Sequence, residues 1–375
     1  MKKILIISHD ASRTGAPMLL LELIKWINKH KKFKISLLLL KEGTLLDDFS
    51  KEATIINYYK NVKVSSYKLK KFLANRNKKL FLNSVKPFDL IFSNTIVNGK
   101  VLEELSELKI PIVSYIHELH FSIGNFIAEG RAQGTLKHSD FLFCGSKLVQ
   151  KTLIENYAIK KEKTKVVNSF VEALNKEKNK TIGDELRKEL KIPLDALVVG
   201  MMGTFDWRKG NDLFIKTATL LQNETIYLVW VGADDKKEIS KIKYDLKMSG
   251  SNPKIKLLAS TPQYKKYYNL FDVFYLSSRE DPYPMVMVEA SLYGLPIICF
   301  KDAGGTQEFI DDKTGCVVPY GNIQKVVEKI NYYNKNRNLL EENGNYIKEK
   351  SAAFHDVDKN AEIIYNKMTT VINYS

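Results

Sequence analysis

A chain of 375 residues is too long for one ordinary hydrophobic core and suits two domains of roughly 150–190 residues. Hydrophobic residues make up 44% and charged residues 27% of the chain, which excludes an intrinsically disordered protein. No apolar run approaches the roughly 18 residues of a membrane span, and the start, MKKILIISHD, predicts a first strand instead of a signal peptide. The three cysteines, at positions 144, 299 and 316, fit neither a disulfide framework nor a zinc site, and indicate a reducing, cytoplasmic compartment.

The net charge of +15 lies in the first half of the chain. Residues 1–192 hold 35 basic and 20 acidic side chains, whereas residues 193–375 hold 23 of each. The segment Lys60–Lys86 carries nine basic residues and no acidic one. Such a field attracts an anionic surface, although a solvated lysine-rich face is the simpler alternative. Nucleic acid is not expected as a partner, because no interleaved aromatics or recognition motif accompany the charge.

Short apolar runs alternate with amphipathic segments through the first half. The expected strands are 3–8, 34–40, 88–94, 111–117 and 140–146, and the expected helices are 16–30, 101–108 and 147–157. This alternation predicts a parallel, doubly wound sheet. The polar segment from Glu172 to Leu190 is the expected linker.

The pattern then starts again. The expected strands are 196–203, 226–233, 254–259, 273–278 and 296–301, and the expected helices are 211–222, 267–272, 285–294 and the tail 356–374. We therefore expect an α/β protein with a first domain of residues 1–180 plus the helix 356–375, and a second domain of residues 193–355. Ligands of such sheets bind at the carboxyl ends of the strands, so the informative residues should follow strands.

The segment SSREDPYPMVMVEASLYG (277–294) carries the strongest motif. Its two prolines end the strand, preset a turn and predict that a helix starts near Met285. The first amides of that helix, at Met285 and Val286, and its positive dipole end form a site for a diphosphate. Glu289, one turn further, can accept hydrogen bonds from ribose hydroxyls, and Asp281 can reach a sugar hydroxyl. The alternative is that Glu289 only pairs locally.

A second motif, GTFDWRKGNDLF (203–214), is a glycine turn between a strand and a helix. Arg208 and Lys209 stand beside Gly210 and can neutralise phosphate charge, while Thr204 lies at the start of the turn. A cation beside a helix N-terminus is disfavoured by the dipole unless an anion binds there, which favours a phosphate site over a plain surface lysine.

Glycines follow two further strands. Gly15 opens a helix after the first strand, with Arg13 and Thr14 as polar neighbours, and Gly304–Gly305 follows the strand at 296–301. A glycine at such a position permits close approach of backbone to a ligand. The chain lacks a G-x-G-x-x-G fingerprint and a phosphate-binding G-x-x-x-x-G-K-[ST] loop, which argues against dinucleotide and ATP binding.

A histidine ends another expected strand, in YIHELH (115–120). A neutral imidazole at His117 can hydrogen-bond a sugar or an acceptor, although a lone histidine is as often structural. Glu118 and His120 are secondary candidates. Ser146 and Asn168 also follow strands and are expected to line the same edge.

These motifs resemble the E-x7-E signature of the retaining GT-B glycosyltransferases (glycosyltransferase family 4, group 1). An acidic residue, seven residues and a glutamate are flanked by E-D-P-Y-P and E-A-x-x-x-G-x-P. The resemblance implies two Rossmann-like domains facing across a cleft, with the nucleotide-sugar in the second. It implies that Glu289 binds the ribose, Asp281 the donor sugar and Lys209 the diphosphate.

The resemblance extends to the first half and includes two departures. It implies that Gly15 approaches the donor phosphates and that His117 lines the catalytic cleft. The family usually has glutamate where this chain has Asp281, and arginine where it has Thr204, so Arg208 is expected to supply the missing charge.

The resemblance implies a retaining glycosyltransferase that moves a sugar from a nucleotide-diphosphate sugar to a glycan or lipid-linked acceptor in bacterial-type cell-surface polysaccharide synthesis. The expected catalytic residues are His117, Asp281, Arg208 and Lys209. No cofactor or metal ion is expected, since cations and the helix start near Met285 can stabilise the departing diphosphate. The first domain would bind the acceptor, with peripheral contact at the inner face of the membrane through the basic segment at 60–86.

Two alternatives stay open. The first is a nucleotide-sugar hydrolase or epimerase of the same architecture. The second is a non-catalytic GT-B partner or scaffold protein, which the departures at Thr204 and Asp281 motivate.

Overall fold

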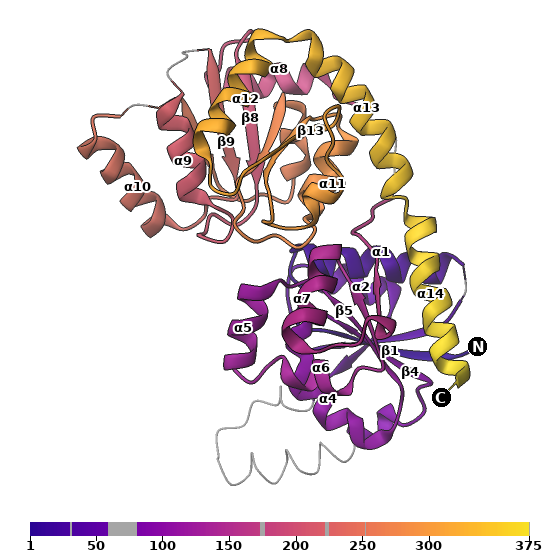
Figure 1. Cartoon of the computed structure of the whole chain (residues 1–375). Coiled ribbons are helices and arrows are strands. Elements are labelled where there is room, and N and C mark those ends of the chain that lie inside the picture. The colour runs from indigo at the N-terminus through magenta and orange to yellow at the C-terminus, as the bar shows by residue number, and fades with distance from the viewer. Residues whose placement is uncertain (31, 59–80, 173–176, 222–224, 252, 375) are drawn as a thin grey trace. The chain divides into compact units, whose positions relative to one another are not determined.

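The computed structural model describes all residues except 31, 59–80, 173–176, 222–224, 252 and 375 (Figure 1). The chain forms two compact units: the first holds Met1–Glu172 and Val357–Ser375, and the second holds Ala173–Asp356. Each unit has one parallel sheet with helices packed on both faces, which confirms the predicted α/β class (Figure 1). None of the helices in the described part of the chain has both the length and the apolar content to cross a membrane.

The first sheet has seven parallel strands in the order β3-β2-β1-β4-β5-β6-β7. The strands are β1 (Lys3–Ser8), β2 (Lys34–Leu39), β3 (Thr54–Asn57), β4 (Leu90–Asn94), β5 (Ile112–Ile116), β6 (Phe141–Cys144) and β7 (Thr164–Val166). Every residue of β4 and β5 is buried. Helices on both faces exclude water, which explains why these strands read as continuous apolar runs.

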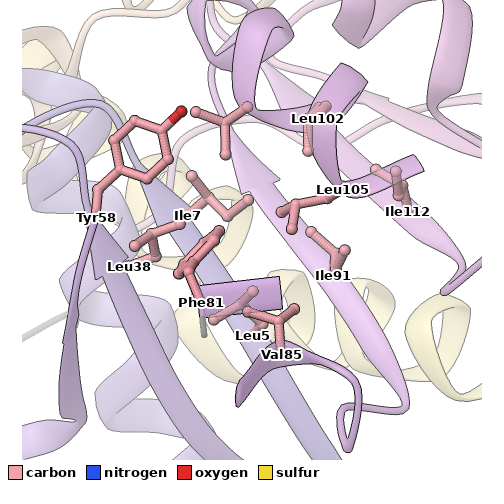
Figure 2. Packing of buried hydrophobic residues seen from close by; sticks show 11 residues of the cluster. Leu5, Ile7, Leu38, Tyr58, Phe81, Val85, Ile91, Leu102, Leu105 and Ile112 are labelled. Carbon is pink, nitrogen blue, oxygen red and sulfur yellow. The ribbon is translucent and has the colours of Figure 1, made fainter. Parts of the chain in front are cut away.

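Helices connect these strands and close the core of the first unit. They are α1 (Gly15–Lys29), α2 (Leu46–Glu52), α4 (Gly99–Leu105), α5 (His120–Ala128), α6 (Gln133–His138), α7 (Lys147–Tyr157) and the short η2 (Ile96–Asn98), η3 (Ser106–Leu108) and η4 (Lys161–Lys163). Figure 2 shows one side of the core, where Leu5 and Ile7 of β1 and Ile91 of β4 meet Leu102 and Leu105 of α4. This cluster holds the central strands in place beneath the loops that follow them.

The tail helix α14 (Val357–Tyr374) belongs to the first unit and lies beside α1 (Figure 1). The indole Nε1 of Trp26 donates to Asp358 at 2.7 Å. The ring centroids of Phe33 and Tyr365 lie 5.0 Å apart. The tail therefore completes the surface of a domain that the chain began 356 residues earlier.

The second sheet has six parallel strands in the order β10-β9-β8-β11-β12-β13. The strands are β8 (Leu197–Met202), β9 (Ile226–Val231), β10 (Ile255–Leu258), β11 (Val273–Leu276), β12 (Ile297–Phe300) and β13 (Gly315–Val318). The helices are α8 (Lys180–Glu189), α9 (Asn211–Leu220), α10 (Lys236–Met248), α11 (Met285–Leu292), α12 (Ile323–Lys335), α13 (Asn338–Phe354) and the short η5 (Tyr264–Asn269) and η6 (Gly305–Glu308).

The prediction of a linker at 172–190 is wrong for residues 180–189, because these residues form α8. The side chain of Asn179 caps this helix by accepting from the Ile182 amide at 3.2 Å. A Cβ on Gly183 would lie 2.6 Å from the carbonyl oxygen of Asn269, so the helix packs backbone to backbone on η5. Arg187, 7% exposed, pairs with Asp272 at 2.9 Å. Leu186 is buried as well, but most of the helix is polar or charged, which is why the sequence indicated a linker. The second unit includes residues 177–192, whereas the expected start of the second domain was 193.

Candidate functional site

The loops after β8 and β11 lie against each other at the carboxyl edge of the second sheet. The Ser277 hydroxyl donates to the Lys209 carbonyl at 2.9 Å, and the Arg279 amide donates to the Arg208 carbonyl at 2.8 Å. Gly210 has φ +73°, and a Cβ there would lie 2.0 Å from the Ser277 carbonyl oxygen. Only glycine permits this approach, so the two loops form one platform.

Lys209 and Asp281 form an ion pair on this platform. Their side chains are only 12% and 8% exposed. The Ser278 hydroxyl also donates to the Asp281 carboxylate at 3.3 Å. Burial lowers the pKa of Lys209, as does the neighbouring Arg208, while Asp281 raises it. The structure thus brings together two residues that the sequence assigned to separate parts of the donor.

The other two candidates of the glycine turn lie at its surface. Thr204 is exposed, and Arg208 is half-buried. The Arg208 guanidinium donates to the carbonyl of Glu280 at 3.0 Å. This bond orients the guanidinium along the loop that contains Asp281. The assignments of Thr204 and Arg208 to a diphosphate stay predictions.

Helix α11 begins at Met285, as predicted, directly after Pro284. The next residue, Val286, is half-buried. One turn into the helix, Glu289 is only 2% exposed. A buried carboxylate needs partners, and its partners come from η5.

Three side chains of η5 bind the Glu289 carboxylate. The hydroxyls of Tyr264 and Tyr268 donate to it at 3.0 and 2.9 Å, and the Lys265 ammonium lies 3.1 Å away. Burial, followed by the charge of Glu289, raises the pKa of Tyr268. Sequence reasoning missed these three residues, because they lie about 25 positions before the glutamate that they hold.

The glycine pair after β12 touches the loop that contains Asp281. The Asp281 amide donates to the Ala303 carbonyl at 2.8 Å, and Asp281 and Gly304 form an isolated parallel bridge. A Cβ on Gly304 would lie 1.7 Å from the Asp281 carbonyl oxygen. Among the described residues, the buried Thr306 hydroxyl has no hydrogen-bond partner. This edge therefore offers an unsatisfied polar group beside a tight backbone contact.

In the first unit, His117 directly follows β5 and has a defined tautomer. Its Nε2 lies 2.9 Å from Asn94 Oδ1, and the Asn94 amide nitrogen donates to the Ala16 carbonyl at 3.0 Å. The asparagine oxygen therefore accepts, and His117 carries its proton on Nε2. Burial, and then the nearby His9, lowers the pKa of His117 to about 3. The imidazole is neutral at physiological pH, with Nδ1 as an acceptor.

The secondary candidates have local structural contacts. The Glu118 carboxylate accepts from the amide of His117 at 2.9 Å. His120 lies at the start of α5 and is exposed, Ser146 caps α7 through the Val149 amide, and Asn168 donates to the Gly145 carbonyl at 3.1 Å. These bonds shape the ends of the strands around His117.

The first loop of the chain also has the expected outline. Gly15 opens α1 and is exposed, after Thr14 in extended conformation. The Arg13 guanidinium pairs with Asp48 at 2.7 Å, with both side chains well exposed. A role of Gly15 beside the donor phosphates stays a prediction.

Two polar groups that the sequence did not single out lie at neighbouring strand ends. Thr95 follows β4 with φ +84°, a conformation that costs energy for a β-branched residue. In the described part of the chain, its buried hydroxyl and the Nδ1 of His9 both lack a hydrogen-bond partner. Strain and unsatisfied polar atoms at strand ends are typical of a ligand-facing edge.

Metal ligands are not grouped in the described residues: no three His, Cys, Asp or Glu side chains there could hold one ion. The metal independence of the reaction stays a prediction. The basic segment Lys60–Lys86 falls mostly on residues 59–80, outside the described residues.

Two α/β units, each built on one parallel sheet, have the architecture of the GT-B fold. The crystal structure of Anabaena HepE in complex with UDP-glucose matches with a TM-score of 0.83 at 18% identity, over 99% of this chain and 100% of that one. WaaG, a glycosyltransferase involved in lipopolysaccharide biosynthesis, matches with a TM-score of 0.73 at 13% identity, over 98% of this chain and 99% of that one.

Residues 183–350 match the family model described as glycosyl transferases group 1, so most of the second unit is similar to that family. The chain is 27% identical over 161 residues to the lipopolysaccharide core biosynthesis glycosyltransferase LpsE of Rhizobium meliloti, covering 42% of this chain and 46% of LpsE. It is 22% identical over 294 residues to the O-antigen biosynthesis glycosyltransferase WclY of Escherichia coli, covering 76% of this chain and 80% of WclY. The match thus spans less than half the length of LpsE.

Proposed function

We propose that the protein is a retaining glycosyltransferase that moves a sugar from a nucleotide-diphosphate sugar to a glycan or lipid-linked acceptor during synthesis of a cell-surface polysaccharide. The match of residues 183–350 to the glycosyl transferases group 1 model supports sugar transfer. The named roles of LpsE in lipopolysaccharide core biosynthesis and of WclY in O-antigen biosynthesis support the polysaccharide context. The UDP-glucose complex of HepE supports a nucleotide-sugar donor.

The observation that carries the proposal is the buried Glu289 at the start of α11. Its carboxylate is held by two tyrosine hydroxyls and a lysine, while the Lys209–Asp281 pair lies on the adjoining platform. A carboxylate has about four lone-pair sites, so Glu289 keeps capacity for a ribose hydroxyl. A ribose ligand and a cation flanking one helix N-terminus suit a nucleoside diphosphate.

The reaction follows from these charges. Lys209, Arg208 and the first amides of α11 would offset the negative charge that develops on the departing diphosphate. Asp281, joined to Lys209, would accept a hydrogen bond from a donor-sugar hydroxyl. A retaining transfer on one face of the sugar needs no carboxylate nucleophile, because the leaving phosphate helps to remove the acceptor proton. The neutral His117 would accept a hydrogen bond from a sugar hydroxyl through Nδ1.

A thermal-shift screen against UDP, GDP, dTDP and their sugars tests donor binding. A ligand at 100 times its dissociation constant adds about 2.7 kcal/mol to native stability, which raises the Tm of a domain of this size by roughly 5–10 °C. Glu289→Gln should abolish that increment, whereas Glu328→Gln, on the exposed face of α12, should keep it. If the ligand raised the Tm of both variants equally, Glu289 would not be part of the nucleotide site.

Product analysis separates the transferase from the hydrolase or epimerase. With the donor found by the screen, a transferase releases nucleoside diphosphate only when an acceptor is present, and the new linkage keeps the anomeric configuration of the donor. Release without acceptor would favour a hydrolase. Unchanged turnover in excess EDTA is expected for a metal-independent reaction.

A non-catalytic partner is the second candidate, and the Lys209–Asp281 pair favours it. The lysine that should meet the diphosphate already has a carboxylate partner, and Thr204 stands where the family usually has arginine. Calorimetry with the three nucleotides decides: absence of binding to all of them would support a scaffold role.

Peripheral membrane contact through Lys60–Lys86 is the remaining part of the proposal. It rests on nine basic residues without an acidic one. Replacing Lys68, Lys70, Lys71, Lys78 and Lys79 by glutamine should reduce co-sedimentation with vesicles that contain anionic lipid. Undiminished co-sedimentation would refute the contact.

A further inference from the structure

The last turn of α13 is hydrogen-bonded to the loop between β11 and α11. The Tyr283 hydroxyl lies 2.7 Å from His355 Nε2, and His355 Nδ1 lies 2.8 Å from the Ser351 hydroxyl. That hydroxyl lies 2.6 Å from the Ser291 hydroxyl of α11. Tyr283 is 5% exposed, and the other three side chains are 1% exposed or less. One buried chain of polar groups therefore joins α13, the loop and α11.

The imidazole of His355 is held in one orientation. Its ring centroid lies 4.7 Å from that of Phe309 and 5.1 Å from that of Phe354. Because burial lowers the pKa of His355 to about 3, the ring is neutral and has one donor and one acceptor. Both ring nitrogens have partners, so rotation of the ring would break two buried hydrogen bonds.

The same turn of α13 also holds the loop after β12. The Lys350 ammonium donates to the Phe309 carbonyl at 2.5 Å and to the Asp311 carboxylate at 2.7 Å. Phe309 follows η6, which begins at Gly305. Both loops that meet at the Asp281–Gly304 bridge are therefore fixed to one helix end.

This helix end has a special place in the chain. Helix α13 ends at Phe354, the second unit ends at Asp356, and the first unit resumes at Val357. Tyr283 lies midway between Asp281 and Met285. His355, which is hydrogen-bonded to the site loop through Tyr283, is thus one of the last residues of the second unit.

We propose that His355 is a positioning residue: by holding the Tyr283 hydroxyl, it fixes Asp281 and the start of α11 in the arrangement that receives the donor diphosphate. The identity of the ligand, a donor diphosphate, rests on the proposed function. The positioning of the loop by His355 does not depend on that function. His355 does not touch the donor; it acts through Tyr283. The junction between the units is thereby bonded to the site loop.

Three substitutions separate positioning from general stability. Tyr283→Phe removes the hydroxyl and keeps the ring. The amide of asparagine reaches about as far as Nδ1, so His355→Asn keeps the Ser351 contact and loses Tyr283. The amide of glutamine reaches about as far as Nε2, so His355→Gln keeps Tyr283 and loses Ser351. Positioning predicts that the first two variants behave alike and that the glutamine variant resembles the wild type.

Hydrogen exchange of the backbone amides in residues 281–288 is the primary measurement. Tyr283→Phe and His355→Asn should accelerate exchange there about tenfold, the effect of losing one buried hydrogen bond, with His355→Gln near the wild-type rate. The same two variants should bind the nucleotide diphosphate selected by the thermal-shift screen about five- to tenfold more weakly. Val327→Ala, on the buried face of α12, should lower Tm without either effect.

Two results would overturn the role. One is unchanged exchange at 281–288 in Tyr283→Phe and His355→Asn. The other is equal acceleration in all three variants, since that would indicate lost stability alone. If the wild type binds UDP, GDP and dTDP too weakly to measure, the proposed function fails, and the exchange data still decide whether His355 positions the loop.

Discussion

Replacing Lys209 by methionine should destabilise the second unit more than any surface substitution. Methionine preserves most of the side-chain volume and removes the ammonium. The Asp281 carboxylate, 8% exposed, would keep the Ser278 hydroxyl at 3.3 Å as its side-chain donor. Stranding one member of a buried pair costs about 3–5 kcal/mol, and the residual donor places the loss near the lower end, at about 3 kcal/mol.

The reverse change should cost less. In Asp281→Asn, Lys209 loses its counter-charge but can shed its proton, because burial already lowers its pKa. We expect a loss of about 1–2 kcal/mol. In the double variant Lys209→Met/Asp281→Asn, neither charge of the pair is left buried. Its loss of stability should therefore be smaller than the sum of the two single losses by about 2 kcal/mol.

Urea unfolding followed by tryptophan fluorescence measures this cycle. Trp207 and Trp230 both lie in the second unit, and the Trp230 indole donates to the Gly203 carbonyl at 2.8 Å, beside the glycine turn. The expected loss for Lys209→Met corresponds to roughly 6–12 °C in Tm. A loss below about 1 kcal/mol with additive single effects would show that the pair is solvated and would refute the argument.

Three further outcomes are expected. Tyr268→Phe removes a donor from the buried Glu289 carboxylate and should cost about 1.5–3 kcal/mol in the free energy of unfolding, measured in urea. Gly304→Ala places a Cβ 1.7 Å from a backbone oxygen and should abolish nucleotide-dependent thermal stabilisation, whereas Gly124→Ala, whose Cβ meets nothing within 4 Å, should leave it intact. Because burial lowers the pKa of His355 to about 3 from 6.5, the unfolded chain binds a proton below pH 6.5 that the folded chain does not. The stability of the second unit should therefore fall by about 2 kcal/mol between pH 6.5 and about pH 5, and His355→Asn should remove this slope there, while the similar contribution of His117 to the first unit stays. An unchanged slope for the second unit would contradict the assignment.

The apolar runs of the sequence predicted the strands of both sheets except β3, β7 and β13, which are short and lie at the sheet edges. Strands such as β4 and β8 are buried at every residue, so continuous hydrophobicity identifies them. The start of α11 at Met285 was also predictable, since proline ends a strand and favours a first helical turn. Helix α8 was not, because only one large apolar residue, Leu186, lies on its buried face, beside a glycine and a paired arginine.

The contacts within the site could not be predicted. Lys209 and Asp281 lie 72 residues apart, and each had its own assigned ligand before the fold joined them. The tyrosines that hold Glu289 come from a short helix with no motif of its own. Spacing along a chain reports local geometry, whereas these contacts depend on which loops the parallel strands bring to one edge of the sheet.

The return of α14 to the first unit constrains how the protein can be made or divided. During synthesis, Trp26 and Phe33 emerge from the ribosome long before Asp358 and Tyr365, so their surface stays uncovered until the whole second unit has been translated. The second unit is one continuous stretch and can be excised as a gene fragment. Residues 1–172 expressed alone would expose an apolar face and should aggregate. Fusing residues 357–375 to their C-terminus should cover that face.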